Sequence, residues 1–223
     1  MYEPFNNSEW IYLLSFYFII CSLVDNFLVF FSGHNARWFK LHACYNFFIV
    51  GLTFDDIYSI ILNPSTGFEY KDMRIAFAVF ILHFYHCIFF KLKPIDYYHH
   101  GLSVFFPAVI VPNICYRFTS IYYFNLCGLP GGIDYLNLVF VKEGYMTKIT
   151  QKQYSSNLNA YIRIPLGIIC CCYNYIGMKN TIDTKIYNSL AIMSFIIYIN
   201  VVYFGKLAIE NHSESKMLQI KQD

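Results

Sequence analysis

The sequence predicts an all-α fold, a polytopic membrane helical bundle of about seven transmembrane helices with a range of about six to eight. Of the 223 residues, 57% are hydrophobic and only 13% are charged, which leaves too little polar surface to cover a soluble globule. The apolar residues also gather in windows of about 20 residues, the length that crosses a bilayer core of roughly 30 Å. Both observations indicate an integral, multi-pass membrane protein.

The windows follow one another in chain order, with polar connections between them. The first is predicted to be a membrane anchor and not a cleaved signal peptide, because no small-residue cleavage site follows it. The predicted organisation is an N-terminal segment with the first span (1–34), a transmembrane domain (35–206) and a polar cytosolic tail (207–223). The windows lie at 10–31, 41–62, 73–92, 97–115, 119–141, 159–178 and 186–205.

Basic residues predict the orientation of these spans. With the N-terminus outside, the connections on the inside carry ten Lys or Arg residues and those on the outside carry five, and Arg163 lies within a span. Cytosolic connections are the more basic ones in membrane proteins. The sequence therefore predicts an outside N-terminus and a cytosolic C-terminus.

The second window carries a row of polar residues. His42, Asn46, Thr53 and Asp56 fall within a narrow arc of one helix face at 100° per residue. An ionised side chain at mid-bilayer costs roughly 2.5–3.5 kcal/mol on insertion scales, so this face is expected to point into the bundle or a wet cavity. A set of interhelical hydrogen bonds that only holds the bundle together is the alternative reading.

Histidines gather where the third window meets the fourth. His83 and His86 are three residues apart and share a helix face, and the stretch 91–100 turns from a basic loop into a helix with adjacent His99 and His100. Asp96 can cap that helix or orient one imidazole. Adjacent helical residues point about 100° apart, so one histidine is expected to face inward and the other a neighbouring helix.

The later windows contain three further features. The run GLPGG at 128–132 predicts a break or a re-entrant turn in the fifth span, directly before Asp134. The polar connection 142–159 is expected to be a surface loop, and the tail from 210 onward is expected to fray. Arg163 opens the sixth span, where it either snorkels to the interface or binds substrate.

Several chemistries are poorly supported by these residues. The histidines lack the number and the HxxxH or HxxHH spacing of membrane di-iron enzymes. A single metal ion on His83, His86 and the histidine pair is an alternative, because a two-residue gap suits one helix face, but nothing fixes the geometry and no metal site is predicted. The eight cysteines lack CxxC spacing and are interpreted as small buried hydrophobes. No bound cofactor and no nucleic-acid partner is predicted.

The histidine pair after an aspartate, together with the sequence RWFKLH at 37–42 leading into a span, resembles the TLC-domain family of TRAM, Lag-type and CLN-type membrane proteins. The resemblance covers roughly residues 35–205. The heavy use of Ile, Asn, Lys, Tyr and Phe is typical of an AT-rich coding sequence and suggests a protist or large-DNA-virus member. It implies catalytic roles for His99, His100 and Asp134. The candidate substrate-binding residues are His42, Asp56, His83, His86, Asp96, Arg117, Lys142 and Arg163.

This resemblance implies a protein that binds, senses or remodels membrane lipid in the endoplasmic reticulum or another host endomembrane. If the protein assembles, a homo-oligomer and a hetero-oligomer are both compatible with the resemblance. The alternative is a ceramide-synthase-like N-acyltransferase, with acyl-CoA as co-substrate and a sphingoid base as acceptor. Only one carboxylate, Asp134, stands where that acyltransferase branch carries two, so the broad family fits better. A transporter or channel, suggested by the GLPGG run alone, ranks lowest.

Overall fold

The computed structural model describes residues 7–221 and confirms the predicted all-α fold class. Within the described residues there is no β-strand, and the only extended pairing is an isolated antiparallel bridge between Tyr70 and Tyr116. In the described part of the chain, four helices are long and apolar enough to cross a membrane: Glu9–Ser32, Arg37–Leu62, Thr119–Lys142 and Thr184–Ile220. The membrane prediction is thus confirmed for these helices, whereas the other three predicted spans fall on shorter or more polar helices.

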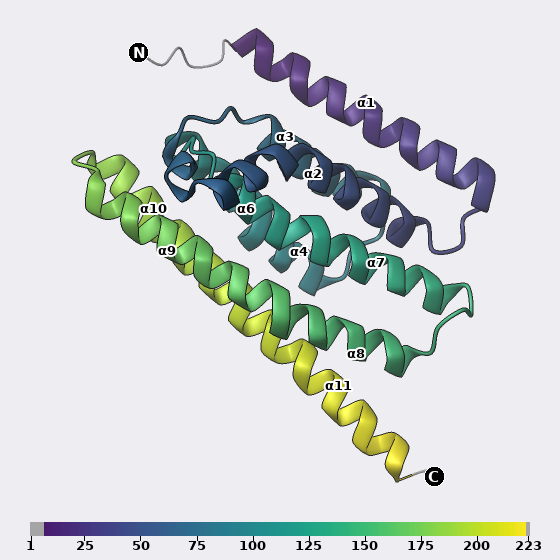
Figure 1. Ribbon diagram of the computed structural model, residues 1–223. Coiled ribbons are helices and arrows are strands. Elements are labelled where there is room, and N and C mark those ends of the chain that lie inside the picture. The colour runs from purple at the N-terminus through teal and green to yellow at the C-terminus, as the bar shows by residue number, and fades with distance from the viewer. Residues whose placement is uncertain (1–6, 222–223) are drawn as a thin grey trace.

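The chain in residues 7–221 folds into seven helical rods that run back and forth, so that the two termini lie at opposite ends of the bundle (Figure 1). The first three rods are α1 (Asn7–Ser32), α2 (Arg37–Leu62) and α3 (Arg74–Phe89), and the short 3₁₀ helix η1 (Pro64–Phe68) follows α2. The fourth rod joins α4 (Pro94–His100), η2 (Gly101–Phe105), α5 (Phe106–Ile110) and η3 (Val111–Asn113).

Each of the last three rods also changes helix type along its length. The fifth joins α6 (Thr119–Tyr123), η4 (Phe124–Gly128) and α7 (Leu129–Lys142). The sixth joins α8 (Lys148–Leu158), η5 (Asn159–Arg163) and α9 (Ile164–Asn180). The seventh joins α10 (Thr184–Ile199), η6 (Asn200–Phe204) and α11 (Gly205–Ile220). The segments η2, η4, η5 and η6 are single π-helical turns.

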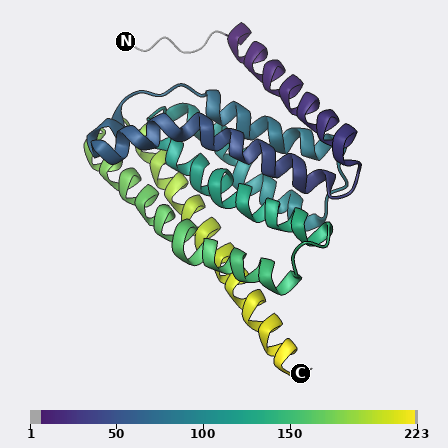
Figure 2. The same cartoon turned by 45° about the vertical axis from the view of Figure 1, so that its right-hand side comes forward.

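Helix α2 lies at the centre of this arrangement. It packs most extensively against α7 and also contacts α1, α3 and α6. The pair α9 and α10 forms one side of the bundle, and α11 extends beyond the other rods with α8 beside it (Figures 1 and 2). The predicted polar row on α2 is buried throughout, because each of His42, Asn46, Thr53 and Asp56 is at most 4% exposed.

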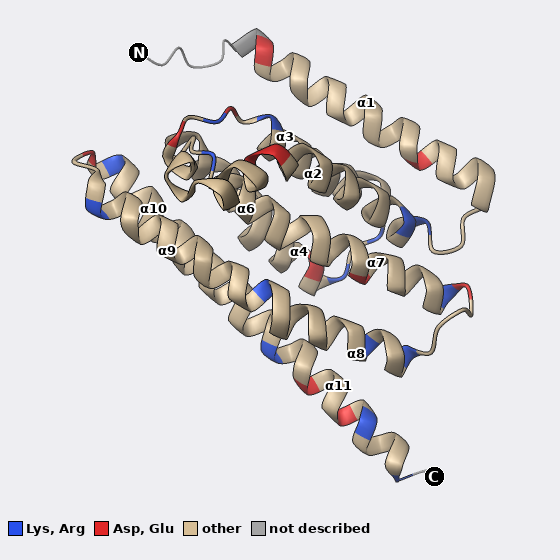
Figure 3. Cartoon of the chain, in the orientation of Figure 1, with Lys and Arg blue, Asp and Glu red and all other residues tan. Residues whose placement is uncertain are grey.

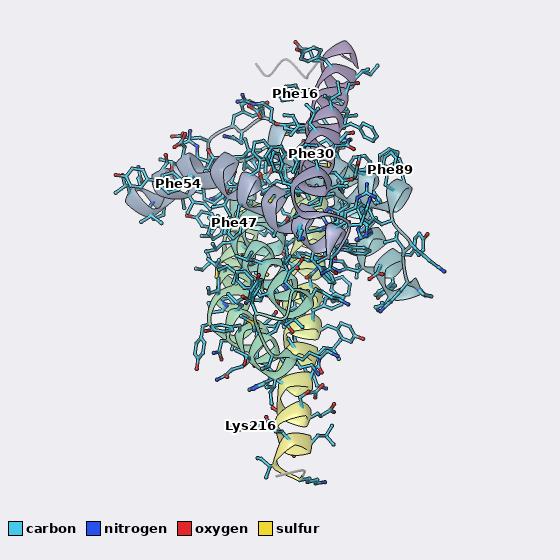
Figure 4. All side chains as sticks on the ribbon, turned by 90° about the vertical axis from the view of Figure 1, so that its right-hand side faces the viewer. Phe16, Phe30, Phe47, Phe54, Phe89 and Lys216 are labelled. Atoms are coloured by element: carbon cyan, nitrogen blue, oxygen red, sulfur yellow. The ribbon has the colours of Figure 1, made fainter. Side chains whose placement is uncertain are left out.

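The outer surface is apolar around the rods. Phe16, Phe30 and Phe54 are among the large apolar side chains that point outward, as a lipid-facing surface requires (Figure 4). Charged residues lie mainly at the rod ends, in the connections and along α8 and α11 (Figure 3). At one rod end Lys40 forms an ion pair of 2.8 Å with Glu143, and this hydrogen-bonded lysine lowers the pKa of the Glu143 carboxyl.

The GLPGG run does not break the fifth rod, which corrects the prediction of an interruption or re-entrant turn. The chain passes through one π turn and continues as α7, with Pro130 in the first helical turn, where proline is tolerated. Its glycines instead allow close packing on α2. A Cβ on Gly131 would lie 2.8 Å from Asn46 Nδ2, and one on Gly132 would lie 3.1 Å from the Phe47 ring. Small residues serve such contacts in membrane helices.

The predicted surface loop 142–159 and the predicted frayed tail are also corrected. Most of the loop is α8, which begins where the Thr147 hydroxyl caps the Thr150 backbone N–H at 3.2 Å. The tail is helical to Ile220. These two polar helices pack on each other, and Lys152 Nζ donates to Ser215 Oγ at 2.6 Å. The sequence windows missed both helices because their residues are polar and solvated, not because helix is disfavoured there.

A buried ion pair fixes α1 to the rest of the bundle. The Asp25 carboxylate on α1 accepts hydrogen bonds from Arg37 Nε at 2.8 Å and Arg37 Nη2 at 2.5 Å, and also from Tyr85 OH at 2.8 Å. The Asp25 side chain is 1% exposed, whereas that of Arg37 is 30% exposed. One carboxylate therefore connects three helices, and its charge is matched and fully hydrogen-bonded.

We expect Arg37→Gln to lower the free energy of unfolding by about 3 kcal/mol, because it leaves the Asp25 carboxylate buried without a cation. Thermal unfolding of the purified protein in detergent micelles measures the change. Arg74→Gln is the matched control, because the Arg74 side chain is 59% exposed in its pair with Asp72, and such pairs contribute at most about 1 kcal/mol. Equal melting temperatures for the two variants would contradict this assignment.

Candidate functional site

A cavity of about 280 Å³ lies inside the bundle, between α2, α3, α4 and α7 and the four π turns. Its polar lining includes many of the residues that the sequence singled out, although they come from six of the seven rods. The polar and charged side chains around it are His42, Asn46, His83, Asp96, His99, Ser103, Asp134, Tyr135, Arg163 and Asn200. Apolar helices thus enclose a polar interior, which is where ionisable groups of a membrane bundle are functional candidates.

Two histidines in the cavity are held in a defined protonation pattern. His42 Nδ1 lies 3.2 Å from the Trp38 carbonyl oxygen, and His83 Nδ1 lies 2.8 Å from the Val79 carbonyl oxygen. A carbonyl oxygen only accepts, so each Nδ1 must carry a proton. In the neutral rings Nε2 is therefore the acceptor nitrogen, and His42 Nε2 has no hydrogen-bond partner.

The adjacent His99 and His100 take different environments. His99 lines the cavity, and its Nδ1 lies 3.4 Å from Ser103 Oγ. Asn200 Nδ2 donates to the same Ser103 oxygen at 2.5 Å, which leaves the Ser103 hydroxyl proton available for His99. The neutral His99 ring would then carry its proton on Nε2. His99 consequently offers a donor where His42 and His83 offer acceptors.

His100 turns away from the cavity toward α3. Its ring centroid lies 5.0 Å from that of His83 and 4.9 Å from that of His86, and its Nδ1 lies 3.6 Å from Cys87 Sγ. His86 is fully buried without lining the cavity, and neither of its ring nitrogens has a hydrogen-bond partner. Four rings, those of His42, His83, His86 and His100, are thus packed together. In residues 7–221 no group of three His, Cys, Asp or Glu side chains is arranged to hold a metal ion.

Asp96 has a local structural role. Its carboxylate accepts the Lys93 backbone N–H at 2.8 Å, which caps α4. Of its two predicted roles, the cap is the one present: no hydrogen bond joins Asp96 to either histidine of the pair among the described residues. Asp96 also lines the cavity from the first turn of α4.

Each of the four π turns contributes to the cavity wall. Ser103 and Val104 come from η2, Leu126 and Cys127 from η4, Arg163 from η5, and Asn200 and Phe204 from η6. A π turn adds a residue to the helical repeat and so rotates the side chains that follow it. Such turns are rare and are frequent at functional sites. Their coincidence in four separate rods marks this level of the bundle as the candidate site.

Asp134 and Arg163 both line the cavity. Gln151 Nε2 donates to Asp134 Oδ1 at 3.0 Å, which joins α7 to α8. The Arg163 backbone carbonyl accepts from Asn125 Nδ2 at 3.1 Å, whereas the side-chain Nε is buried without a partner. Arg163 therefore does not snorkel to the interface; its side chain faces the interior.

Asp56, Arg117 and Lys142, which were predicted to bind substrate, do not line the cavity; for Asp56 this corrects the expectation that it shares a cavity with the histidines. Asp56 pairs with Lys71 Nζ at 2.9 Å and with Arg117 Nε at 3.4 Å, and it accepts from Ser120 Oγ at 2.6 Å. This buried cluster joins the far end of α2 to the connections before α3 and α6. Lys142 is exposed at the end of α7. Periodicity placed Asp56 on the correct face of α2, but the helix is long enough for that face to serve two sites.

The sequence did not single out two residues that line or support the cavity. Asn200 lines it, and Gln151 holds Asp134. Asn46, which the sequence placed on the polar face of α2, lines the cavity as well. Asn200 carried a usable signal, because an amide within an apolar window requires a polar partner inside the bundle. Gln151 carried none, since it lies among other polar residues of α8.

No protein-family model, curated protein or solved structure matches this chain. The resemblance to the TLC-domain family therefore rests on the quoted motifs alone, and it remains a prediction.

Proposed function

We propose that this chain is a multi-pass membrane protein that binds a membrane lipid, with the polar head group in the histidine-lined cavity and a hydrocarbon chain beside it. The supporting observation is that the polar cavity adjoins an apolar slot of about 30 Å³. The two share Ser103, Val104, Leu126 and Cys127 in their walls. An amphiphile needs such a junction, whereas a water-soluble ligand does not.

The slot extends the cavity into the hydrocarbon-like core of the bundle. Its remaining wall is almost wholly apolar: Ala76, Val79, Phe80, Pro107, Ala108, Val111, Tyr122, Tyr123 and Met193. The slot is narrow, so the proposal requires the four side chains at the junction to shift for a hydrocarbon chain to enter. The polar cavity lies just below the roughly 300–1,000 Å³ of typical ligand sites, a size suited to a head group more than to a whole lipid.

The same proposal includes seven membrane crossings, with the N-terminus outside and the C-terminus in the cytosol. It also includes location in the endoplasmic reticulum or a related endomembrane and membership of the TLC-type proteins. Seven antiparallel rods and opposite termini support the odd number of crossings. The mouth of the cavity, near Asp96, then faces the cytosolic side, where Lys91 and Lys93 are exposed.

We expect a C-terminal epitope tag to be accessible after selective permeabilisation of the plasma membrane, and an N-terminal tag to be protected. The physical reason is the excess of basic residues in the connections assigned to the cytosol. Immunofluorescence before and after full permeabilisation measures both tags. Detection of both tags on one side of the membrane would contradict seven crossings.

We expect Val104→Phe to remove lipid that copurifies with the protein, because Val104 lines both the polar cavity and the slot and is 5% exposed. The expected loss is about tenfold in bound lipid per protein, measured by quantitative mass spectrometry of detergent-purified samples. Leu126→Phe blocks the same junction from another rod and is expected to act alike.

Val109→Phe is the matched control, because Val109 lies in the same rod and is 75% exposed on the outer surface. It places the same ring in the lipid phase and should leave the cavity lipid in place. Equal lipid content in all three variants and the parent would contradict the assignment of the cavity as the lipid-binding site.

A second candidate function is N-acyl transfer, and the protonation pattern of His42 and His83 favours it. An unprotonated Nε2 in the cavity can take a proton from a sphingoid amine while the amine nitrogen attacks the thioester carbonyl of acyl-CoA. The C–N bond forms, the C–S bond breaks, and the proton passes from the imidazole to the CoA thiolate. Exposed Lys91 and Lys93 suit the CoA phosphates. His100, predicted as catalytic, faces α3 and is less well placed than His99 or His83.

We expect that, if this second function holds, the purified protein makes ceramide from sphinganine and palmitoyl-CoA, and that His42→Gln or His83→Gln lowers the rate at least ~100-fold. Mass spectrometry of ceramide, together with free CoA, measures the reaction. His34→Gln is the control, because His34 is exposed in the connection before α2. If the parent protein forms no ceramide, the acyltransferase function is excluded for these substrates, while lipid binding stands.

The hypothesis of a transporter or channel depended on an interrupted fifth span. The fifth rod is helical from Thr119 to Lys142, so that structural argument for a transporter no longer applies.

A further inference from the structure

The arginines of this chain differ in their partners. Arg37, Arg74 and Arg117 each form an ion pair with a carboxylate. Arg163 has no carboxylate oxygen within 4.0 Å among residues 7–221, although it lines the internal cavity and its Nε is buried without a partner. A buried cation normally requires an anion. The cavity that Arg163 lines is the place where one can be supplied.

Asp134 faces the same cavity, and the two opposite charges do not pair. Its carboxylate is hydrogen-bonded by the neutral Gln151 amide at 3.0 Å. The remaining acid, Asp96, caps the N-terminus of α4, where the helix dipole offsets its charge. The cavity is therefore lined by one cation and by one anion that no cation pairs with and no helix N-terminus stabilises.

Gly131 lies in the cavity wall between Asn46 and Arg163. A Cβ placed on Gly131 would lie 2.8 Å from Asn46 Nδ2, which would have to move, and 3.8 Å from Arg163 Nη2, which is an ordinary contact distance. A guanidinium offers a planar fork of donors that matches phosphate, and a carboxylate accepts from an ammonium group.

We propose that the cavity selects a zwitterionic head group, with Arg163 binding its phosphate and Asp134 binding its ammonium. This inference rests on the proposed lipid-binding function and names the class of lipid. A head group that carries both charges satisfies both residues without adding net charge to the interior. A purely anionic or cationic head group would leave one residue unpaired and place a like charge near the other.

The test compares four lipids with identical dioleoyl chains on the full-length protein in detergent, by native mass spectrometry. The lipids are phosphatidylethanolamine (zwitterionic), phosphatidylglycerol (anionic), trimethylammonium propane (cationic) and diacylglycerol (neutral). We expect the parent protein to retain phosphatidylethanolamine about tenfold better than the others. We expect Arg163→Gln to shift the preference to the cationic lipid and Asp134→Asn to shift it to the anionic one.

This reciprocal switch is a readout that a merely structural role for either residue would not produce. Arg74→Gln, which removes an exposed cation far from the cavity wall, is expected to keep the parental order. Equal retention of all four lipids by the parent, lost in Val104→Phe, would overturn the charge selection and leave lipid binding intact. Retention of none of them would overturn the lipid function itself.

Soluble phosphoethanolamine distinguishes the source of the head group. We expect it to compete with dioleoyl phosphatidylethanolamine, since both carry the same two charges. Binding of the soluble molecule without any lipid would support the charge assignment and overturn the lipid function. Competition by glycerol, which carries no charge, would show that the cavity recognises neither charge of the head group and would overturn the charge selection.

Discussion

The row of buried polar side chains along α2 is the constraint on which the rest of the bundle depends. Hydrocarbon offers these groups no hydrogen bonds, so the other rods must surround α2 and keep this face away from lipid. At one end Asp56 is matched by Lys71 and Arg117. At the other end His42 meets the histidines of α3 and the wall of the cavity. The central place of α2 follows from this requirement more than from its apolar surface.

Close packing around α2 has a consequence for the cavity. Glycines at 131 and 132 let the backbone of α7 lie directly against side chains of α2. In the π turn before them, Leu126 and Cys127 face the cavity. In the other π turns, Ser103, Arg163 and Asn200 do the same. The four π turns of the described chain thus all contribute side chains to the wall of one polar space.

The ionic interactions of the bundle fall into two kinds. Asp25 with Arg37 and Asp56 with Lys71 are compensated within the protein, and they join helices. Asp134 and Arg163 share a cavity without an ion pair between them among the described residues, and their matching is left to something outside the chain. Compensated charges stabilise the fold, whereas uncompensated charges that face a cavity provide the chemistry of recognition. This distinction underlies the proposed choice of ligand.

Composition, window length and helical periodicity determined the all-α class, the membrane character of the main helices and the buried face of α2, because these depend on local patterns. They also brought forward His42, His83, His99, Asp134 and Arg163, since ionisable residues in apolar windows must face inward. Three-dimensional packing decided what local patterns do not contain. It separated Asp56 from the cavity, turned His100 toward α3, made GLPGG a packing surface and folded α8 against α11. Each outcome depends on which distant helix supplies the neighbouring atoms, and only the tertiary structure specifies that neighbour.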